Sequence, residues 1–179
     1  GEGFCIFNDV AIACNLLIKN HGFSKILILD LDVHQGNGTA KIFENTPEVF
    51  TFSIHGEKNY PTRKEKSNLD IGLPDKTEDA YYLSVLDENL KKTIDLCEPE
   101  IVFYNAGVDI LKSDKLGRLS VSREGAKKRE EMVFKTLKKN NIPVIAVMGG
   151  GYSEKLTDII YAHANTYRVA QYLYFCLKY

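Results

Sequence analysis

Residues 26–38 read ILILDLDVHQGNG, and this stretch decides the fold. Ile26 to Leu29 form a continuous apolar run, which is typical of a strand buried on both faces in a parallel sheet. Asp30, Asp32 and His34 follow at alternate positions, so an extended chain would point them to one side. Two carboxylates and an imidazole this close repel one another and lose solvation unless a cation lies among them. The stretch therefore predicts a parallel strand whose end is either a metal site or a set of helix-capping and turn-forming residues.

The rest of the sequence alternates short apolar runs with longer amphipathic segments, which is typical of an α/β domain with a parallel sheet sandwiched between helices. Further strands are expected at 49–54, 101–104 and 144–148, and helices at 9–19, 77–97, 122–140 and 153–176, the last either continuous or broken near its middle. Residues 59–75 hold two prolines and many charges, so a long surface loop is predicted there. The basic run Lys127-Lys128-Arg129, followed by Glu130-Glu131, is predicted to be a solvated helix face. Residues 1–179 are interpreted as one domain.

The composition excludes several classes of protein. The chain has 179 residues, of which 44% are hydrophobic and 26% charged, as in an ordinary globular domain. A formal net charge of −1 gives no field that would attract nucleic acid or an anionic membrane, and the apolar runs are too short to span a bilayer. No signal peptide is visible. Four scattered cysteines without Cys-x-x-Cys spacing favour reduced thiols over a zinc finger or a disulfide, in the cytoplasm or in the nucleus of a eukaryote. Composition leaves the oligomeric state open.

A second predicted strand end supplies another carboxylate. Residues 104–109 read YNAGVD, which brings Asp109 to the sheet edge where Asp32 and His34 lie, because parallel sheets bind ligands at the carboxyl ends of their strands. One aspartate alone in such a place is usually a helix cap or a turn former. Asp, His and Asp together hold a divalent ion with one position left for water, as catalytic zinc sites do. Such an ion polarises a carbonyl and acidifies its bound water, and an oxygen-rich ligand set accepts Fe²⁺ as well as zinc.

Five motifs together resemble the histone deacetylase family in their order and approximate spacing. They are Gly3–Asp9, Leu29–Gly38, Asn105–Leu111, Leu116–Ser120 and Gly149–Tyr152, and they cover nearly the whole chain. The strand end Ser53-Ile54-His55 and the loop from Lys64 to Leu73 look more like the bacterial and class IV branch than the class I enzymes. The resemblance implies the arginase/deacetylase fold and zinc-dependent hydrolysis of acetyl-lysine, or of a similar acylated amine such as an acylpolyamine.

The resemblance also implies roles at the metal site. Asp32, His34 and Asp109 match the zinc ligands of the family. Tyr152 matches the tyrosine whose hydroxyl donates to the substrate carbonyl and then to the tetrahedral oxyanion. Asp30 and Asn37 match the residues that orient a catalytic histidine pair. Asp30 also matches part of a monovalent-cation site, expected to hold structural potassium, together with backbone carbonyls near Asp32, His34, Ser53 and Ile54.

A substrate pocket is implied in the same way. Phe4 and Tyr60 match the aromatic walls of a narrow tunnel for the lysine methylenes. Cys5 matches a cysteine near the acetyl group. Gly150 and Gly151, which precede the tyrosine, would let the backbone approach the acyl group.

One feature of the family is absent from this sequence. The two adjacent histidines that act as general base and acid lie upstream of the Gly-Phe-Cys segment in the family, and this chain opens on Gly1-Glu2-Gly3. We therefore expect a fold that is incomplete on its N-terminal side and weak turnover by these residues alone. His21 and His163 are expected to be structural, whereas His55 could be structural or line the mouth of the pocket.

Two alternatives to an active deacetylase stay open. A catalytically incomplete fragment, or a binding module, would keep the metal and the fold without turnover. A manganese ureohydrolase of the arginase type shares the architecture, but it needs bridging carboxylates for two metals. Gln35 follows His34 here, and no second Asp-x-Asp lies near Asp109, which disfavours the ureohydrolase.

Overall fold

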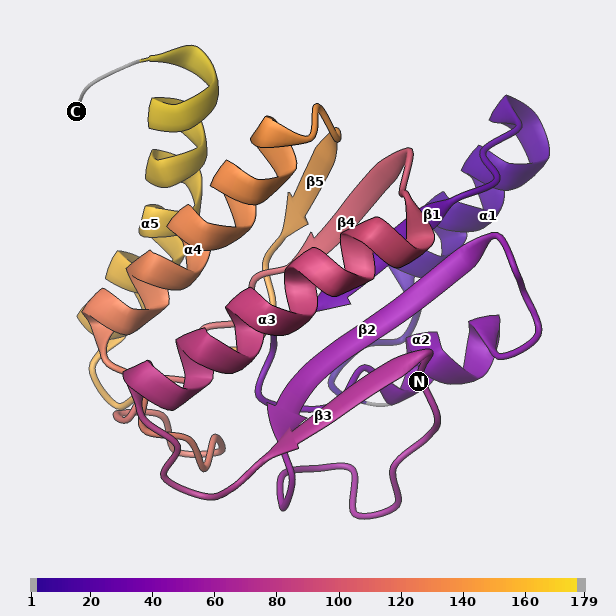
Figure 1. Cartoon of the computed structure of the whole chain (residues 1–179). Coiled ribbons are helices and arrows are strands. Elements are labelled where there is room, and N and C mark those ends of the chain that lie inside the picture. The colour runs from indigo at the N-terminus through magenta and orange to yellow at the C-terminus, as the bar shows by residue number, and fades with distance from the viewer. Residues whose placement is uncertain (1–2, 177–179) are drawn as a thin grey trace.

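The computed structural model describes residues 3–176, which form a five-stranded parallel sheet flanked by helices (Figure 1). The strands are β1 (Ile26–Asp30), β2 (Val49–Gly56), β3 (Leu69–Leu73), β4 (Ile101–Asn105) and β5 (Val144–Val147), in the sheet order β3-β2-β1-β4-β5. The helices are α1 (Asp9–His21), α2 (Asn37–Phe43), α3 (Asp79–Cys97), α4 (Arg123–Lys139) and α5 (Leu156–Phe175). The predicted α/β class with a parallel sheet is confirmed.

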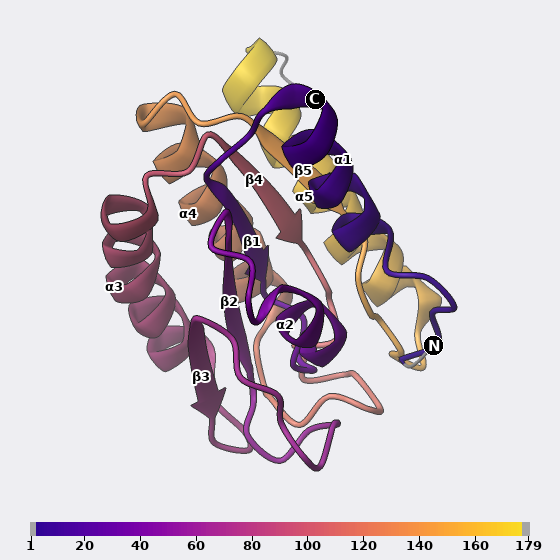
Figure 2. The same ribbon diagram turned by 90° about the vertical axis from the view of Figure 1, so that its right-hand side faces the viewer.

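Two apolar cores lie on opposite faces of the sheet. Successive side chains along a strand point alternately into one core and into the other. From β1, Leu27 and Leu29 enter the larger core with residues of α3, α4 and α5, whereas Ile26 and Ile28 enter a smaller core with α1 and α2. Figure 2 shows α3 and α4 on one side of the strands and α1 and α2 on the other. The residues of β1 are apolar without interruption because both faces of the strand are buried, as the sequence indicated.

Local sequence signals set the helix ends. The Asn8 side chain caps α1 by accepting a hydrogen bond from the Ala11 N–H at 2.9 Å, and Gly22 ends the helix with a left-handed φ of 71°. Ser122 caps α4 in the same way through the Gly125 N–H at 2.9 Å. Both helices lie where they were predicted.

Other predicted boundaries were wrong. The segment 59–75 is not only a loop, because its last part forms the edge strand β3. Thr77 does not open α3, since its hydroxyl donates to the Pro74 carbonyl and the helix begins at Asp79. Helix α5 is continuous, and it begins at Leu156 rather than at Ser153. The short helix α2 had no counterpart in the sequence prediction.

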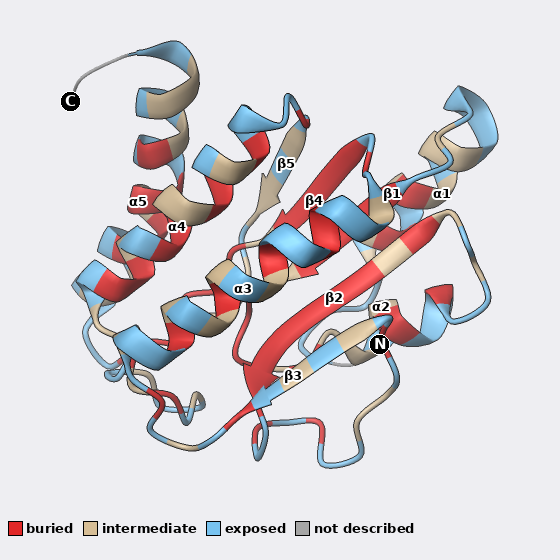
Figure 3. Ribbon diagram, viewed as in Figure 1, coloured by how far each residue is buried: buried red, intermediate tan, exposed pale blue. Residues whose placement is uncertain are grey.

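Burial falls from the centre of the sheet to its edges (Figure 3). Four of the five residues of β1 are buried, whereas β5 has only intermediate and exposed residues. No helix in the described part of the chain is long and apolar enough to cross a membrane.

The strand order reverses between β1 and β4. The chain passes from β1 outward through β2 to β3, and β4 then returns to the other side of β1, with Asp30 in register with Asn105. The loops that follow β1 and β4 leave the sheet at the carboxyl ends of these two strands. Open α/β sheets bind ligands at such a reversal of strand order.

Candidate metal centre

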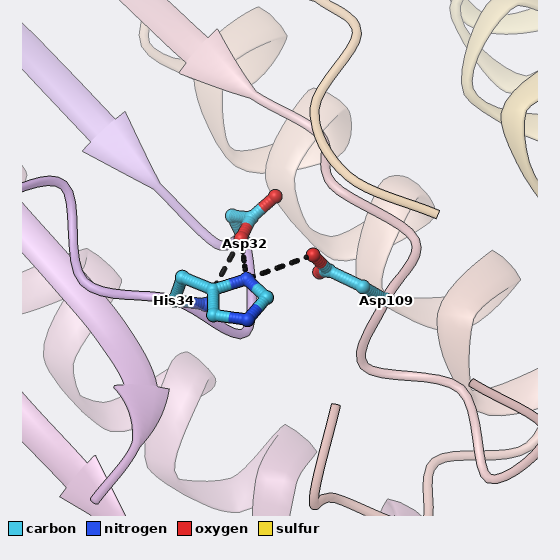
Figure 4. Close-up of side chains that lie close together, drawn as sticks. All are labelled: Asp32, His34 and Asp109. Atoms are coloured by element: carbon cyan, nitrogen blue, oxygen red, sulfur yellow. Dashed lines mark hydrogen bonds and ion pairs between the residues drawn. The ribbon is translucent and has the colours of Figure 1, made fainter. Parts of the chain in front are cut away.

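The loop after β1 and the loop after β4 bring three ligand-type side chains together. Asp32 and His34 come from the first loop and Asp109 from the second, and one ligand atom from each lies within 4.8 Å of the others. The His34 Nδ1 atom is 3.1 Å from Asp32 Oδ1 and 3.1 Å from Asp109 Oδ2 (Figure 4). Asp32 and Asp109 are buried, and the His34 side chain is 22% exposed. The convergence predicted for these three residues is present.

Backbone hydrogen bonds fix the carboxylates from behind. The Val33 N–H donates to Asp109 Oδ1 at 2.9 Å, which joins the two loops directly. The Gly150 N–H donates to Asp32 Oδ2 at 2.7 Å and adds the loop after β5. Asp109 Oδ2 approaches Gly150 so closely that a Cβ atom there would overlap it, so this position accepts no side chain.

The electrostatics of the cluster are those of a cation site. Burial and the neighbouring Asp32 charge raise the pKa of Asp109. Burial alone would lower the pKa of His34, but hydrogen bonds to Asp109 and Asp32 raise it to about 10. Burial also opposes the ionisation of Asp32, and hydrogen bonds from His34 and the Gly150 N–H outweigh it and lower the pKa of Asp32. The imidazole thus keeps its proton because two carboxylates face it, and a divalent cation would supply the same positive charge.

Asp30 does not join the triad, because the strand ends at this residue and the alternation stops with it. Its carboxylate turns toward β4 and accepts from the Asp32 N–H at 3.1 Å and from Asn105 Nδ2 at 2.9 Å. Burial, followed by the Asp32 charge, raises the pKa of Asp30 well above its usual range. Asp30 therefore supports the backbone of a ligand rather than acting as one.

The other residues predicted around Asp30 lie close to it in the fold. Ser53 is its register partner on β2, Ile54 follows Ser53, and Asn37 begins α2. Asp30 and Ser53 share the lining of a cavity of about 10 Å³, which is about the smallest that can hold one water molecule. The monovalent-cation role of these residues stays a prediction.

Tyr152 lies beside the triad. Its ring is edge-on to the His34 ring at 6.5 Å between centroids, and its backbone N–H donates to Asp114 Oδ2 at 2.6 Å. Burial, and then the charges of Asp109 and Asp32, raise the pKa of Tyr152, so the phenol stays a hydrogen-bond donor at neutral pH. A cation site with a protonated phenol next to it has the parts needed to polarise a carbonyl and to stabilise an oxyanion.

Comparisons with known proteins assign the family. The family model for the histone deacetylase domain matches residues 1–167. The chain belongs to the histone deacetylase family. Histone deacetylase 2 of Arabidopsis thaliana is 33% identical over 163 residues, which are 89% of this chain and 42% of that protein. An uncharacterized protein of Picosynechococcus sp. is 44% identical over 97% of this chain and 58% of its own length.

Solved structures agree on the architecture of this deacetylase-family chain. The HDA15 HD domain superposes with a TM-score of 0.79 at 26% identity, covering 95% of this chain and 52% of that one. An acetylpolyamine aminohydrolase from Burkholderia pseudomallei superposes with a TM-score of 0.81 at 22% identity, which shows the fold alone. The chain spans about half the length of these relatives.

The predicted pocket residues of this histone deacetylase relative are only partly brought together. The Phe4 ring lies 5.9 Å from the Tyr152 ring, and Cys5 follows it near the same phenol. Gly150 and Gly151 pass behind the triad, where Gly151 lies against Val108. Tyr60 is half exposed in the loop after β2, and its place in a tunnel wall stays a prediction.

The remaining histidines lie outside the triad. His21 is exposed at the end of α1, and His163 is buried on α5, so their structural roles stay predictions. His55 does not line the mouth of a pocket: it is buried beside Ser53, and burial lowers its pKa to about 4.

One prediction about α4 was wrong. Arg129 and Glu130 do not belong to a solvated face, because both are buried and their side chains pair with each other. A periodic signal was available: these residues continue the apolar stripe of Ala126, Val133 and Leu137 at helical spacing. Asp114 was also missed, although an aspartate before Leu116-Gly117 is typical of a turn that binds backbone N–H groups.

Proposed function

We propose that this chain provides the metal-binding portion of a zinc-dependent deacetylase, which hydrolyses the amide of acetyl-lysine or of a similar acylated amine. One observation carries the proposal: Asp32, His34 and Asp109 converge within 4.8 Å, next to the phenol of Tyr152. Two carboxylates and one imidazole fit zinc, and they also fit Fe²⁺. Among the described residues these three form the only such cluster of metal-ligating side chains, which disfavours a two-manganese ureohydrolase.

The roles of the side chains follow from their places. When bound, zinc would supply Lewis acidity to the amide carbonyl and lower the pKa of water. Asp32, Asp109 and the Nδ1 atom of His34 would hold the ion, and the bonds that the Val33 and Gly150 N–H groups donate to the two carboxylates keep the loops in place. The Tyr152 hydroxyl donates to the carbonyl oxygen of the substrate and to the oxyanion that develops from it. Gly150 has no Cβ atom, which leaves room for the Asp109 carboxylate that packs against it.

A metal-binding module without turnover is the second candidate. The positions of the histidines favour this candidate. The sequence has four histidines, and only His34 bonds to the carboxylates of Asp32 and Asp109. A general base must reach the proton of the attacking water, and the triad itself has no free imidazole for that task. We therefore propose that these 179 residues alone hydrolyse acyl-lysine poorly, and that the longer parent protein hydrolyses it well.

Zinc content and deacetylation, measured on this chain and on an upstream-extended version, test both proposals. Both forms should bind one zinc ion, and Asp109→Ala should abolish that binding. Tyr152→Phe in the extended protein should lower kcat on the order of 10²–10³-fold with unchanged zinc content, because only a transition-state donor is lost. Tyr172→Phe, an exposed phenol on α5, is the matched control and should change neither quantity.

Three results would count against these proposals. Retained turnover in Tyr152→Phe would refute the role of that phenol. Full activity in the short form would refute the need for upstream residues. Absence of zinc from both forms would refute the metal centre and the hydrolase with it.

A further inference from the structure

A fully buried guanidinium lies behind the metal-binding loops. Arg129, on α4, is 0% exposed, and its Nη1 atom donates to the backbone carbonyl of Leu31 at 3.1 Å and to that of Gly107 at 2.7 Å. Leu31 immediately precedes the ligand Asp32, and Gly107 lies two residues before the ligand Asp109. One nitrogen atom therefore joins the two ligand-bearing loops at their roots.

The two carbonyls lie at the last backbone contacts of the sheet. The Leu31 N–H still donates to the Asn105 carbonyl at 3.1 Å, and the Val108 N–H donates to the Gly150 carbonyl at 2.7 Å. The paired residues of β1 and β4 end at Asp30 and Asn105, so Leu31 and Gly107 lie just beyond the ladder. Gly107 also lies against the first ligand, since a Cβ atom on it would overlap Asp32 Oδ2. A shift of the Gly107 carbonyl would therefore move the surface against which Asp32 rests.

A carboxylate orients the guanidinium. Glu130 Oε1 accepts from Arg129 Nε at 2.9 Å and from Nη2 at 2.5 Å, and Tyr104 donates its hydroxyl to Glu130 Oε2 at 2.8 Å. The planar fork of arginine is used on both sides, with Glu130 on one side and the two carbonyls on the other. A buried ion pair is often no more stabilising than well-packed apolar side chains of similar volume. General packing of the core thus does not account for a charged pair at this place.

We infer that Arg129, oriented by Glu130, is a positioning residue for the metal centre: it sets the separation of the two loops that present Asp32 and Asp109. The inference rests on the proposed metal-binding function, which it deepens. Its direct consequence is local, because the hydrogen bonds across the loops need this separation. These are the bonds from the Val33 N–H to Asp109 and from the Gly150 N–H to Asp32.

The double variant Arg129→Met/Glu130→Gln tests the inference in the full chain. It removes both bonds to the loop carbonyls without leaving an unpaired charge, and the amide oxygen introduced at position 130 would still accept from the Tyr104 hydroxyl. Leu137→Ala is the control, because Leu137 is buried on the same helix two turns further on, in the apolar core. Thermal unfolding of both variants calibrates any general loss of stability.

Two measurements decide the outcome. In the metal-free protein, hydrogen exchange of the Val33 and Gly150 amides should become roughly tenfold faster in the double variant, beyond any change in Leu137→Ala. The zinc dissociation constant, from competition with a chromophoric chelator, should rise about 10- to 100-fold in the double variant, as when a support behind a ligand is lost. Leu137→Ala should leave the zinc dissociation constant unchanged.

Exchange and zinc affinity no more altered than in Leu137→Ala would overturn the inference. If the double variant does not fold, Arg129→Lys replaces it, since lysine keeps the charge but not the fork, and the same two comparisons apply. Should the unaltered chain bind no zinc, the proposed function fails, whereas exchange in the metal-free protein still decides the role of Arg129.

Discussion

At the scale of single residues, the proposed metal centre is supported by side chains outside the triad of Asp32, His34 and Asp109. Asp114 is the clearest case besides Arg129. Its Oδ2 atom accepts from the Tyr152 N–H, and its Oδ1 atom accepts from the N–H groups of Leu116 at 2.9 Å and Gly117 at 2.8 Å. One carboxylate therefore ties the tyrosine backbone to the turn at 114–117.

Asp114→Ala should loosen the placement of Tyr152 without removing any metal ligand. We expect kcat in the upstream-extended protein to fall roughly 10- to 100-fold, because a small misplacement of a catalytic group is costly. Zinc content should stay the same. Asp95→Ala, at an exposed position on α3, is the control, and equal kcat values for the two variants would contradict the role given to Asp114.

The sequence predicted the convergence of the triad better than the residues that support it, and the reason is physical. Asp32, His34 and Asp109 follow apolar runs directly, so their position at a sheet edge could be read from the order of residues alone. Arg129 was misjudged because a charged run is usually solvated, and only the three-dimensional path of the loops supplies its carbonyl partners. Asp30 was expected to support the triad or to bind a monovalent cation, and its carboxylate accepts from the Asp32 N–H and from Asn105.

At the scale of elements, the start of α4 is held by the hydroxyl of Ser122 and by its backbone N–H, which donates to Asp79 Oδ1 at 2.7 Å. Ser122 accepts from the Gly125 N–H and donates to Asp79 Oδ2 at 2.6 Å, which links the first turns of α3 and α4. Because α4 carries Arg129 and Glu130, this cap also sets the position of the helix beneath the centre.

Ser122→Ala should lower the free energy of unfolding by about 1 kcal/mol, and by no more than about 2 kcal/mol, as for other lost N-caps. Denaturant unfolding measures the change. Ser84→Ala is the comparison, because that hydroxyl bonds only to the carbonyl of Tyr81 on the exposed side of α3, and its effect should stay within about 0.5 kcal/mol. A loss in Ser84→Ala as large as that in Ser122→Ala would exclude the capping explanation.

Elements with strong periodicity were predictable and short edge elements were not. The central strands have continuous apolar runs because both of their faces are covered. Strand β3 is half solvated, so only Leu69, Ile71 and Leu73 alternate within a charged segment that reads as a loop. Helix α2 has seven residues, too few for a helical period to appear.

At the scale of the whole molecule, the sheet has an apolar edge that is open to solvent. Among residues 3–176, β5 pairs only with β4, and Ile145 and Met148 are 42% and 62% exposed. Exposed apolar residues of α1, Ile12 and Leu16, add to the apolar surface of the molecule. Edges of this kind tend to pair with other chains.

The isolated chain should therefore self-associate as its concentration rises. Sedimentation velocity should show species heavier than the monomer, and Ile145→Lys should reduce them, because an edge lysine resists strand pairing. Leu96→Lys introduces the same charge at an exposed site on α3, away from the edge, and should have no such effect. Monomeric behaviour at all concentrations would show that this edge is inert.

The parallel register of β1 with β4 has a consequence for how errors in folding are detected. Asp30 pairs with Asn105, and this register fixes how the residues of the loop after β1 are aligned with those of the loop after β4. A slip of one residue would present Leu31 and Val33 where Asp32 and His34 belong, and hydrocarbon cannot coordinate zinc. Chains with the shifted register would then bind no zinc, so the fraction of molecules that bind zinc would equal the fraction whose strands β1 and β4 pair in the correct register.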